Sequence, residues 1–152
     1  MSHKTFTGRC FIEEIPRYIT LYRALPVNIE KGFVPRYVFD IVLKKDTVKI
    51  GLITLRAALT SELLVRGGHI GFAIDENYRG HHYAAKALLT LKPFIAEVIN
   101  GPVLITCDSD NSASRRTIEK FGGKLTKIVE QIENPEDHTK KDCCYYELTI
   151  QQ

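Results

Sequence analysis

The feature that most constrains the fold is a short apolar run that leads through a polar turn into an amphipathic helix. Residues 70–74 are apolar, and the turn formers Asp75, Asn77 and Gly80 follow them. Apolar residues then recur at helical spacing, at Ala84, Ala87, Leu88, Leu91, Ile95 and Val98. The pattern predicts a strand, a tight turn and a helix over about residues 82–99, and therefore an α/β protein.

The first turn of this helix is suited to binding a phosphate group. Its unpaired N–H groups and the positive end of the helix dipole face the turn that holds Arg79 and Gly80. Arg79 can donate two hydrogen bonds to phosphate oxygens, and Gly80 lets a phosphate approach the backbone. A pyrophosphate fits these groups. The alternatives are that Arg79 is an ordinary surface arginine and that Gly80 is needed only for a positive φ angle.

The run Arg79-Gly80-His81-His82-Tyr83-Ala84 resembles the (Gln/Arg)-x-x-Gly-x-(Gly/Ala) loop that holds the pyrophosphate of acetyl-CoA in the GNAT superfamily of N-acetyltransferases. Residues 103–108, Asn111, Ser114 and residues 118–123 resemble the next strand and helix of that superfamily, in the same order and spacing. The resemblance covers about residues 49–125. Within the superfamily, the chain is similar to a group of predicted acetyltransferases whose acceptors are poorly defined.

This resemblance implies a mixed, mostly antiparallel sheet flanked by helices, with a parallel strand pair at the acetyl-CoA site. It implies one acetyltransferase domain over residues 1–152, with direct transfer of an acetyl group from acetyl-CoA to an amine and no covalent enzyme intermediate. The residues expected to bind acetyl-CoA are Phe72, Ala73, Ile74, Arg79, Gly80, His81, His82, Tyr83, Ala84 and Asn111. Asn111 is read equally well as the N-cap of the following helix.

The chain departs from the superfamily pattern at two positions. His82 stands in place of the central glycine of the loop, and Ile118 in place of the tyrosine thought to protonate the departing thiolate. Ile118 therefore favours an alternative function, a CoA-binding regulatory module without turnover. A protonated His82 would add a donor to the phosphate site.

Two residues are the candidates for proton transfer. Ser114, one helical turn before Ile118, is placed to protonate the thiolate directly or through a water, and His69 is the nearest titratable group for the proton of the amine. The alternatives are that Ser114 forms hydrogen bonds only within its own helix and that His69 is buried and bonded to the backbone. A backbone N–H of the strand is expected to polarise the thioester carbonyl, with the small Gly71 and Ala73 leaving room for it near His69.

Composition limits the other possibilities. A net charge of +3 over 152 residues is too small to indicate nucleic acid. The sequence shows neither a long apolar run nor a charged-then-apolar start, which predicts no membrane span, no secretory signal and a cytoplasmic location. The four cysteines lack zinc-site spacing, so we expect reduced thiols and no metal. The expected partner is a peptide or small-molecule amine, and a homodimer is compatible with the sequence.

The rest of the chain is expected to complete the sheet. Alternating or β-branched runs predict strands at residues 18–24, 36–43, 48–56, 124–131 and 143–150, and a short helix within residues 57–66. Residues 122–123, both glycine, are expected to end the second long helix. The pattern of residues 5–15 is ambiguous. The loop from Pro26 to Pro35 is expected to shape the choice of acceptor.

Overall fold

The computed structural model describes residues 24–25, 35–43 and 48–150. The elements in chain order are β1 (Ala24–Leu25), β2 (Arg36–Leu43), β3 (Val48–Arg56), α1 (Ser61–Val65), β4 (Ile70–Ile74), a 3₁₀ turn (Glu76–Tyr78), α2 (Tyr83–Val98), β5 (Val103–Asp108), α3 (Ser112–Phe121), β6 (Lys124–Glu133) and β7 (Lys140–Leu148). The predicted helices and the strands from residue 36 onward are confirmed. The expectations for residues 5–15, 26–34 and most of 18–24 fall outside the described residues.

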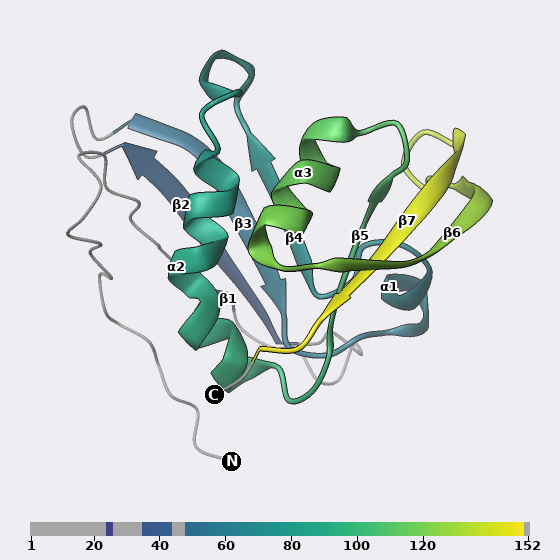
Figure 1. Ribbon diagram of the computed structural model, residues 1–152, viewed down its shortest axis with the longest axis horizontal. Coiled ribbons are helices and arrows are strands. Elements are labelled where there is room, and N and C mark those ends of the chain that lie inside the picture. The colour runs from purple at the N-terminus through teal and green to yellow at the C-terminus, as the bar shows by residue number, and fades with distance from the viewer. Residues whose placement is uncertain (1–23, 26–34, 44–47, 151–152) are drawn as a thin grey trace.

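The strands form two sheets that open away from each other. One sheet has the strand order β1-β2-β3-β4 and the other has the order β5-β7-β6, and every ladder within the described residues is antiparallel. Helix α2 lies across the first sheet, and α3 lies between α2 and the second sheet (Figure 1). No helix in the described ranges has the length and apolar character needed to cross a membrane.

Strands β4 and β5 are neighbours that run in the same direction and diverge (Figure 1). Within the described residues, the backbone hydrogen bonding between these segments lies just before the start of β4. There an isolated bridge pairs Gly68 with Ile105, and the His69 N–H donates to the Leu104 carbonyl at 2.8 Å. The Leu104 N–H donates to His69 Nδ1 at 2.9 Å, so a side chain takes the donor that a ladder would use. The expected parallel pair therefore has no hydrogen-bonded ladder, which leaves space between the strands.

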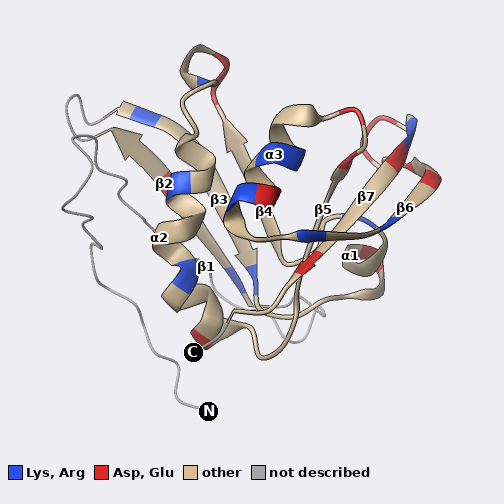
Figure 2. Cartoon of the chain, in the orientation of Figure 1, with Lys and Arg blue, Asp and Glu red and all other residues tan. Residues whose placement is uncertain are grey.

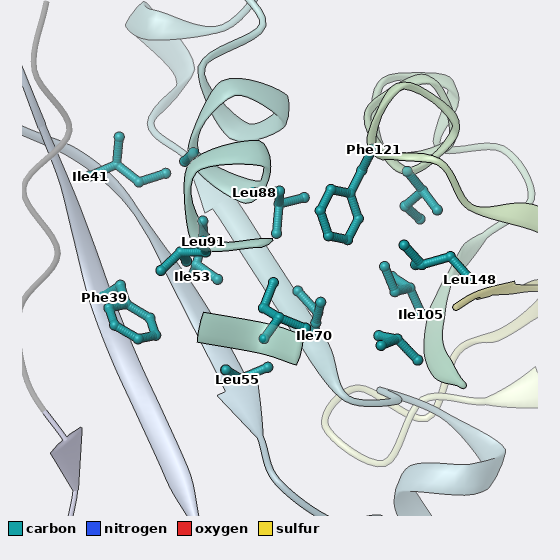
Figure 3. Close-up of a cluster of buried hydrophobic side chains, with 14 of the residues drawn as sticks. Phe39, Ile41, Ile53, Leu55, Ile70, Leu88, Leu91, Ile105, Phe121 and Leu148 are labelled. Atoms are coloured by element: carbon teal, nitrogen blue, oxygen red, sulfur yellow. The ribbon is translucent and has the colours of Figure 1, made fainter. Parts of the chain in front are cut away.

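A single hydrophobic core joins the two sheets through the helices. Alternate residues of β4 point to opposite faces, and Ile70, Phe72 and Ile74 join the cluster that includes Leu88 and Leu91 of α2, as the alternation predicted. Phe121 of α3 and Ile105 of β5 extend the cluster to the second sheet (Figure 3). This packing fixes α2 and α3 on either side of the space between β4 and β5.

Helix α3 is held in place at both ends and along one face. The Asn111 side chain accepts from the Ser114 N–H at 3.1 Å and caps the first turn, and Gly122 ends the helix with a φ angle of 113°. The buried hydroxyl of Tyr146 accepts from Arg115 Nε and donates to Glu119, both at 3.0 Å. Burial, as the largest cause, raises the pKa of Tyr146, so this network is intact at neutral pH.

Candidate active site

Two clefts meet where β4 and β5 separate. A large cleft of about 530 Å³ lies between β4, the loop before α2, and α3. A small cleft of about 250 Å³ lies on the other side, between β4, β5 and the end of α1. Three residues border both clefts, namely Phe72, Asn111 and Ser114.

The large cleft brings together nearly all of the residues predicted to bind acetyl-CoA. It is lined by Phe72, Ala73, Ile74, Arg79, Gly80, His82, Tyr83, Ala84 and Asn111. His81 is exposed and does not line this cleft, and its ring lies 5.4 Å from that of Tyr83. The loop therefore turns five of its six residues toward the cleft.

Arg79 is oriented for an anion. Its Nε donates to the carbonyl of Ile74 at 2.8 Å, which ties the side chain to the end of β4 and leaves both terminal nitrogens without a partner within the described residues. Gly80 has a φ angle of 86°, and a Cβ there would meet nothing within 4 Å. The glycine thus satisfies the backbone and also leaves open space beside it.

His82 keeps the backbone shape that the loop needs. Its φ and ψ angles are 61° and 26°, in the left-handed region where the superfamily pattern has glycine. Histidine is one of the residues that adopt this region more often than most. Lys120 Nζ lies 3.0 Å from His82 Nδ1, and because an ammonium only donates, Nδ1 accepts. The ring is thereby held against α3.

The edge of β4 that faces the clefts carries the N–H of Phe72, as the hydrogen bonds of its neighbours show. The N–H of Asp75 donates to Ile50 of β3 at 2.7 Å, whereas the carbonyl of Ile74 points away from β3 and accepts a side-chain hydrogen bond. Because residues two apart share a direction in an antiparallel ladder, the N–H of Phe72 also points away from β3. It lies on the open edge, at the junction of the two clefts.

Ser114 and Asn111 have polar atoms to spare at this junction. The Ser114 hydroxyl makes no hydrogen bond within the described residues, whereas Thr117, one turn later, donates back to Ala113 at 3.0 Å. Asn111 caps α3 through its oxygen, so its amide N–H₂ group stays available. Ile118 is fully buried in the core and borders neither cleft. Its apolar side chain therefore supplies no polar group to the junction.

His69 lies apart from both clefts. It is 8% exposed, and its Nδ1 accepts the hydrogen bond from Leu104 that joins β4 to β5. Burial lowers the pKa of His69 below its ordinary value. Its role as the base stays a prediction, and this position counts against it, since the ring acts instead as a structural acceptor.

The pKa of His69 leads to a prediction about stability. Because the unfolded chain binds a proton near pH 6.5 and the folded chain only at lower pH, the contribution of His69 is complete above pH 6.5 and is lost as pH falls below it. The loss is about 1.4 kcal/mol for each unit by which the pKa is lowered. Urea unfolding between pH 5 and 8 measures it, and His69→Asn is expected to remove this part of the pH dependence. Equal pH dependence in both proteins would contradict the assignment.

The small cleft carries charges that sequence reasoning missed. Arg56 and Arg66 line it, together with Asp108, which pairs with Arg66 Nη2 at 2.7 Å. A Cβ on Gly71 would lie 3.8 Å from Nη1 and Nη2 of Arg56, so a guanidinium borders the space over Gly71. Gly71 still lines the small cleft, and the room that it leaves for the thioester stays a prediction.

The cysteines at the small cleft are not nucleophiles. Burial is the main cause that raises the pKa of Cys107 to about 12, and it also raises the pKa of Cys143. Both are therefore protonated at neutral pH. No group of His, Cys, Asp and Glu side chains that could hold a metal occurs within the described part of the chain.

The α3 face of the large cleft was also missed. Ala113, Arg116 and Thr117 line the cleft, and Lys120 on the next turn contacts His82. These positions follow the i, i+3, i+4, i+7 spacing of one helix face. A small residue followed by two cations at that spacing, beside a predicted phosphate loop, is the signal that could have identified them.

Solved structures of several acetyltransferases share this fold. The structure of the microcin C7 self-immunity acetyltransferase MccE with acetyl-CoA and AMP has 20% identity and a TM-score of 0.62, over 76% of this chain and 61% of that one. A GNAT family acetyltransferase from Bacillus anthracis has 24% identity and a TM-score of 0.61, over 76% and 67%. An acetyl transferase from Salmonella typhimurium that modifies the N-terminal serine of ribosomal protein L7/L12 has 20% identity and a TM-score of 0.62, over 80% and 67%.

The chain covers part of each of these solved structures, and a family model covers most of the chain. The chain spans 61% to 67% of the length of these three solved structures, and at such identities they establish the fold. No curated protein matches the sequence significantly. The model of a family described as the acetyltransferase (GNAT) domain matches residues 12–124, which is most of the sequence. The chain therefore belongs to the GNAT acetyltransferase domain family.

Proposed function

We propose that residues 1–152 form a single-domain N-acetyltransferase that moves the acetyl group of acetyl-CoA directly to an amine. The observation that supports this most is that the two clefts share three lining residues. One contains the phosphate-binding loop, and the other is a second, smaller cleft; Phe72, Asn111 and Ser114 line both. Two substrates bound in the two clefts would meet there. The proposal includes a cytoplasmic location, which the free thiols of Cys107, Cys143 and Cys144 support.

The large cleft has groups that suit the pyrophosphate, the pantetheine arm and the thioester of acetyl-CoA, in the order in which these parts follow along the molecule. The pyrophosphate binds the terminal nitrogens of Arg79 and N–H groups at the start of α2. The pantetheine arm runs along the open edge of β4, where its amides replace the missing strand, and the Asn111 amide donates to one of its carbonyls. The thioester then reaches the junction, where the Phe72 N–H stabilises the oxyanion as it forms.

The chemistry requires an unprotonated amine and a stabilised leaving thiolate. The amine attacks the carbonyl carbon, the tetrahedral species collapses, and the bond to sulfur breaks. The Ser114 hydroxyl, which has no partner in the described residues, donates to the departing sulfur directly or through a water. The proton of the amine leaves through water in the small cleft, since no side chain with a suitable free base borders the junction among the described residues.

The test is release of CoA thiol from acetyl-CoA with a panel of primary amines, with acetylated products identified by mass spectrometry. The proposal requires thiol release that depends on both the protein and an amine. Tight binding of acetyl-CoA by calorimetry with no amine-dependent release would favour the regulatory module instead. Absence of both binding and release would remove acetyl-CoA as the ligand.

Ser114→Ala is expected to lower kcat about tenfold and to leave the affinity for acetyl-CoA unchanged. Loss of one hydrogen bond to a developing charge costs at least about 1.4 kcal/mol, and that bond exists only in the transition state. Single-turnover kinetics separates chemistry from product release. Thr117→Ser, which lies one turn away and keeps a hydroxyl, is the matched control with near-normal turnover. An unchanged single-turnover rate in Ser114→Ala would contradict the role.

A further inference from the structure

Arg56 is a half-buried cation that forms no ion pair with the residues that the structure describes. Its Nη1 donates to the carbonyl of Gly68 at 3.2 Å and more weakly to that of Gly67 at 3.5 Å, and no carboxylate pairs with it among the described residues. Removing a charge from water is costly unless an opposite charge compensates it. Burial is the main cause that lowers the pKa of Arg56, which reflects this unbalanced position.

A second arginine makes the position less favourable still. Arg36 lies directly opposite Arg56 in the ladder between β2 and β3, where like charges destabilise a sheet. The repulsion from Arg36 is the other cause that lowers the pKa of Arg56. The adjoining ends of β2 and β3 are accordingly both basic (Figure 2). Two facing arginines are stabilised when an anion lies between or beside them.

The third cation of this region, Arg66, pairs with a carboxylate through only one of its two terminal nitrogens among the described residues. Arg66 Nη2 pairs with Asp108 at 2.7 Å, while its Nη1 is buried and has no hydrogen-bond partner in the described residues. The carboxylate of Asp108 is thus already engaged, and Lys141 Nζ lies 3.9 Å from its other oxygen. The small cleft therefore has two arginines and one neutralised aspartate on its wall, which leaves a net positive charge.

The distribution of charge distinguishes the two clefts by their ligands. The anion of the large cleft is the pyrophosphate assigned above to Arg79 and α2. Arg56 and Arg66 line only the small cleft, across the Phe72 junction from that loop, so they are not part of the same phosphate site. The cation that remains unbalanced is on the acceptor side.

From this geometry we infer that the acceptor amine carries a carboxylate, which the guanidinium of Arg56 binds, with Arg36 strengthening the local positive potential. The inference rests on the proposed acetyl transfer, because it names the class of molecule that enters the small cleft. Planar, bidentate recognition of a carboxylate is what a guanidinium with free Nε and Nη2 groups does best. Free amino acids and peptides with an acidic residue next to the N-terminal amine share this chemistry.

The experiment compares acceptors that differ only in the carboxylate. The free amino acids are paired with their amides, and peptides beginning with aspartate are paired with the same peptides beginning with asparagine. We expect each carboxylated member to have a kcat/KM at least tenfold higher than its neutral partner. A preference among the amino acid pairs identifies a small molecule, and one confined to the peptide pairs identifies an acidic N terminus. Equal kcat/KM within every pair overturns the inference.

Variants assign the preference to Arg56. Arg56→Gln is expected to raise KM for carboxylated acceptors about tenfold, with unchanged KM for neutral acceptors and for acetyl-CoA. Because Arg56 also bonds the carbonyls of residues 67–68, Arg36→Gln is the second variant, with a smaller rise of about threefold. Lys124→Gln, at an exposed lysine of β6 that lines neither cleft, is the control. Equal loss for neutral and carboxylated acceptors in both variants would contradict carboxylate binding.

A binding measurement separates this inference from the proposed function. Calorimetry with the carboxylated amines and CoA needs no turnover. Binding that is lost in Arg56→Gln, in a protein that releases no thiol, would support the anion site and refute catalysis. Thiol release with neutral amines only, together with no binding of carboxylated ones, would support catalysis and refute the anion site.

Discussion

Gly68→Ala is expected to lower the free energy of unfolding by about 3 kcal/mol or more, because two costs combine at this residue. Gly68 has a φ angle of 61°, and a Cβ there would lie 2.5 Å from the carbonyl oxygen of Leu104 and 3.3 Å from the Cα of Ile105. Backbone atoms of a buried strand cannot move aside as the end of a flexible side chain can. The junction of β4 and β5 would have to open, and urea unfolding measures the loss.

Gly101→Ala is the matched control for this substitution. Gly101 also has a positive φ angle, of 112°, but a Cβ there would meet nothing within 4 Å. It carries the conformational cost alone, about 1 to 2 kcal/mol. Because a φ angle of 112° lies outside the left-handed region that alanine can adopt at 61°, the difference between the two variants is a lower bound on the cost of the close approach. Equal destabilisation by the two variants would contradict the expected difference.

Arg79→Ala is expected to weaken acetyl-CoA binding roughly 10- to 100-fold, the worth of charged hydrogen bonds of about 1.5 to 3 kcal/mol. The side chain is exposed, and its only described bond is the one from Nε to Ile74, so the fold should tolerate the change. Arg79→Lys keeps the charge but not the planar fork and is expected to recover part of the affinity. Calorimetry with acetyl-CoA provides the measurement.

Two controls locate the effect. Lys124→Ala removes an exposed positive charge that lines neither cleft and should leave the affinity unchanged, which separates a local contact from the overall field. CoA that lacks its 3′-phosphate should lose less affinity than a fragment that lacks the pyrophosphate. Equal binding by wild type and Arg79→Ala would remove the pyrophosphate from this loop.

Local patterns in the sequence predicted most of the fold. The strand at residues 70–74, the turn and α2 follow from periodicity and turn residues, because these features depend on neighbours along the chain. The grouping of the loop residues around the large cleft followed from the family resemblance. The same resemblance implied a parallel strand pair, but it could not indicate that His69 would take the N–H of Leu104 in place of a ladder.

The small cleft could not be predicted in the same way. Arg56 reaches Gly71 from the adjacent strand, and Arg66 meets Asp108 although 42 residues separate them in the sequence. Such contacts depend on how the sheets are placed, and no local spacing encodes them. Arg36 and Arg56 are the exception, because the hairpin predicted for residues 36–43 and 48–56 could have been extended to pair its two ends.

The left-handed backbone at His82 has a consequence for finding proteins of this kind. A search that demands glycine at that position tests residue identity, whereas the loop depends on a dihedral angle that histidine here adopts at 61°. Asparagine and aspartate adopt the same region with comparable ease. A search that admits these residues, and requires only that no β-branched side chain occupies the position, would recover homologues that a glycine criterion discards.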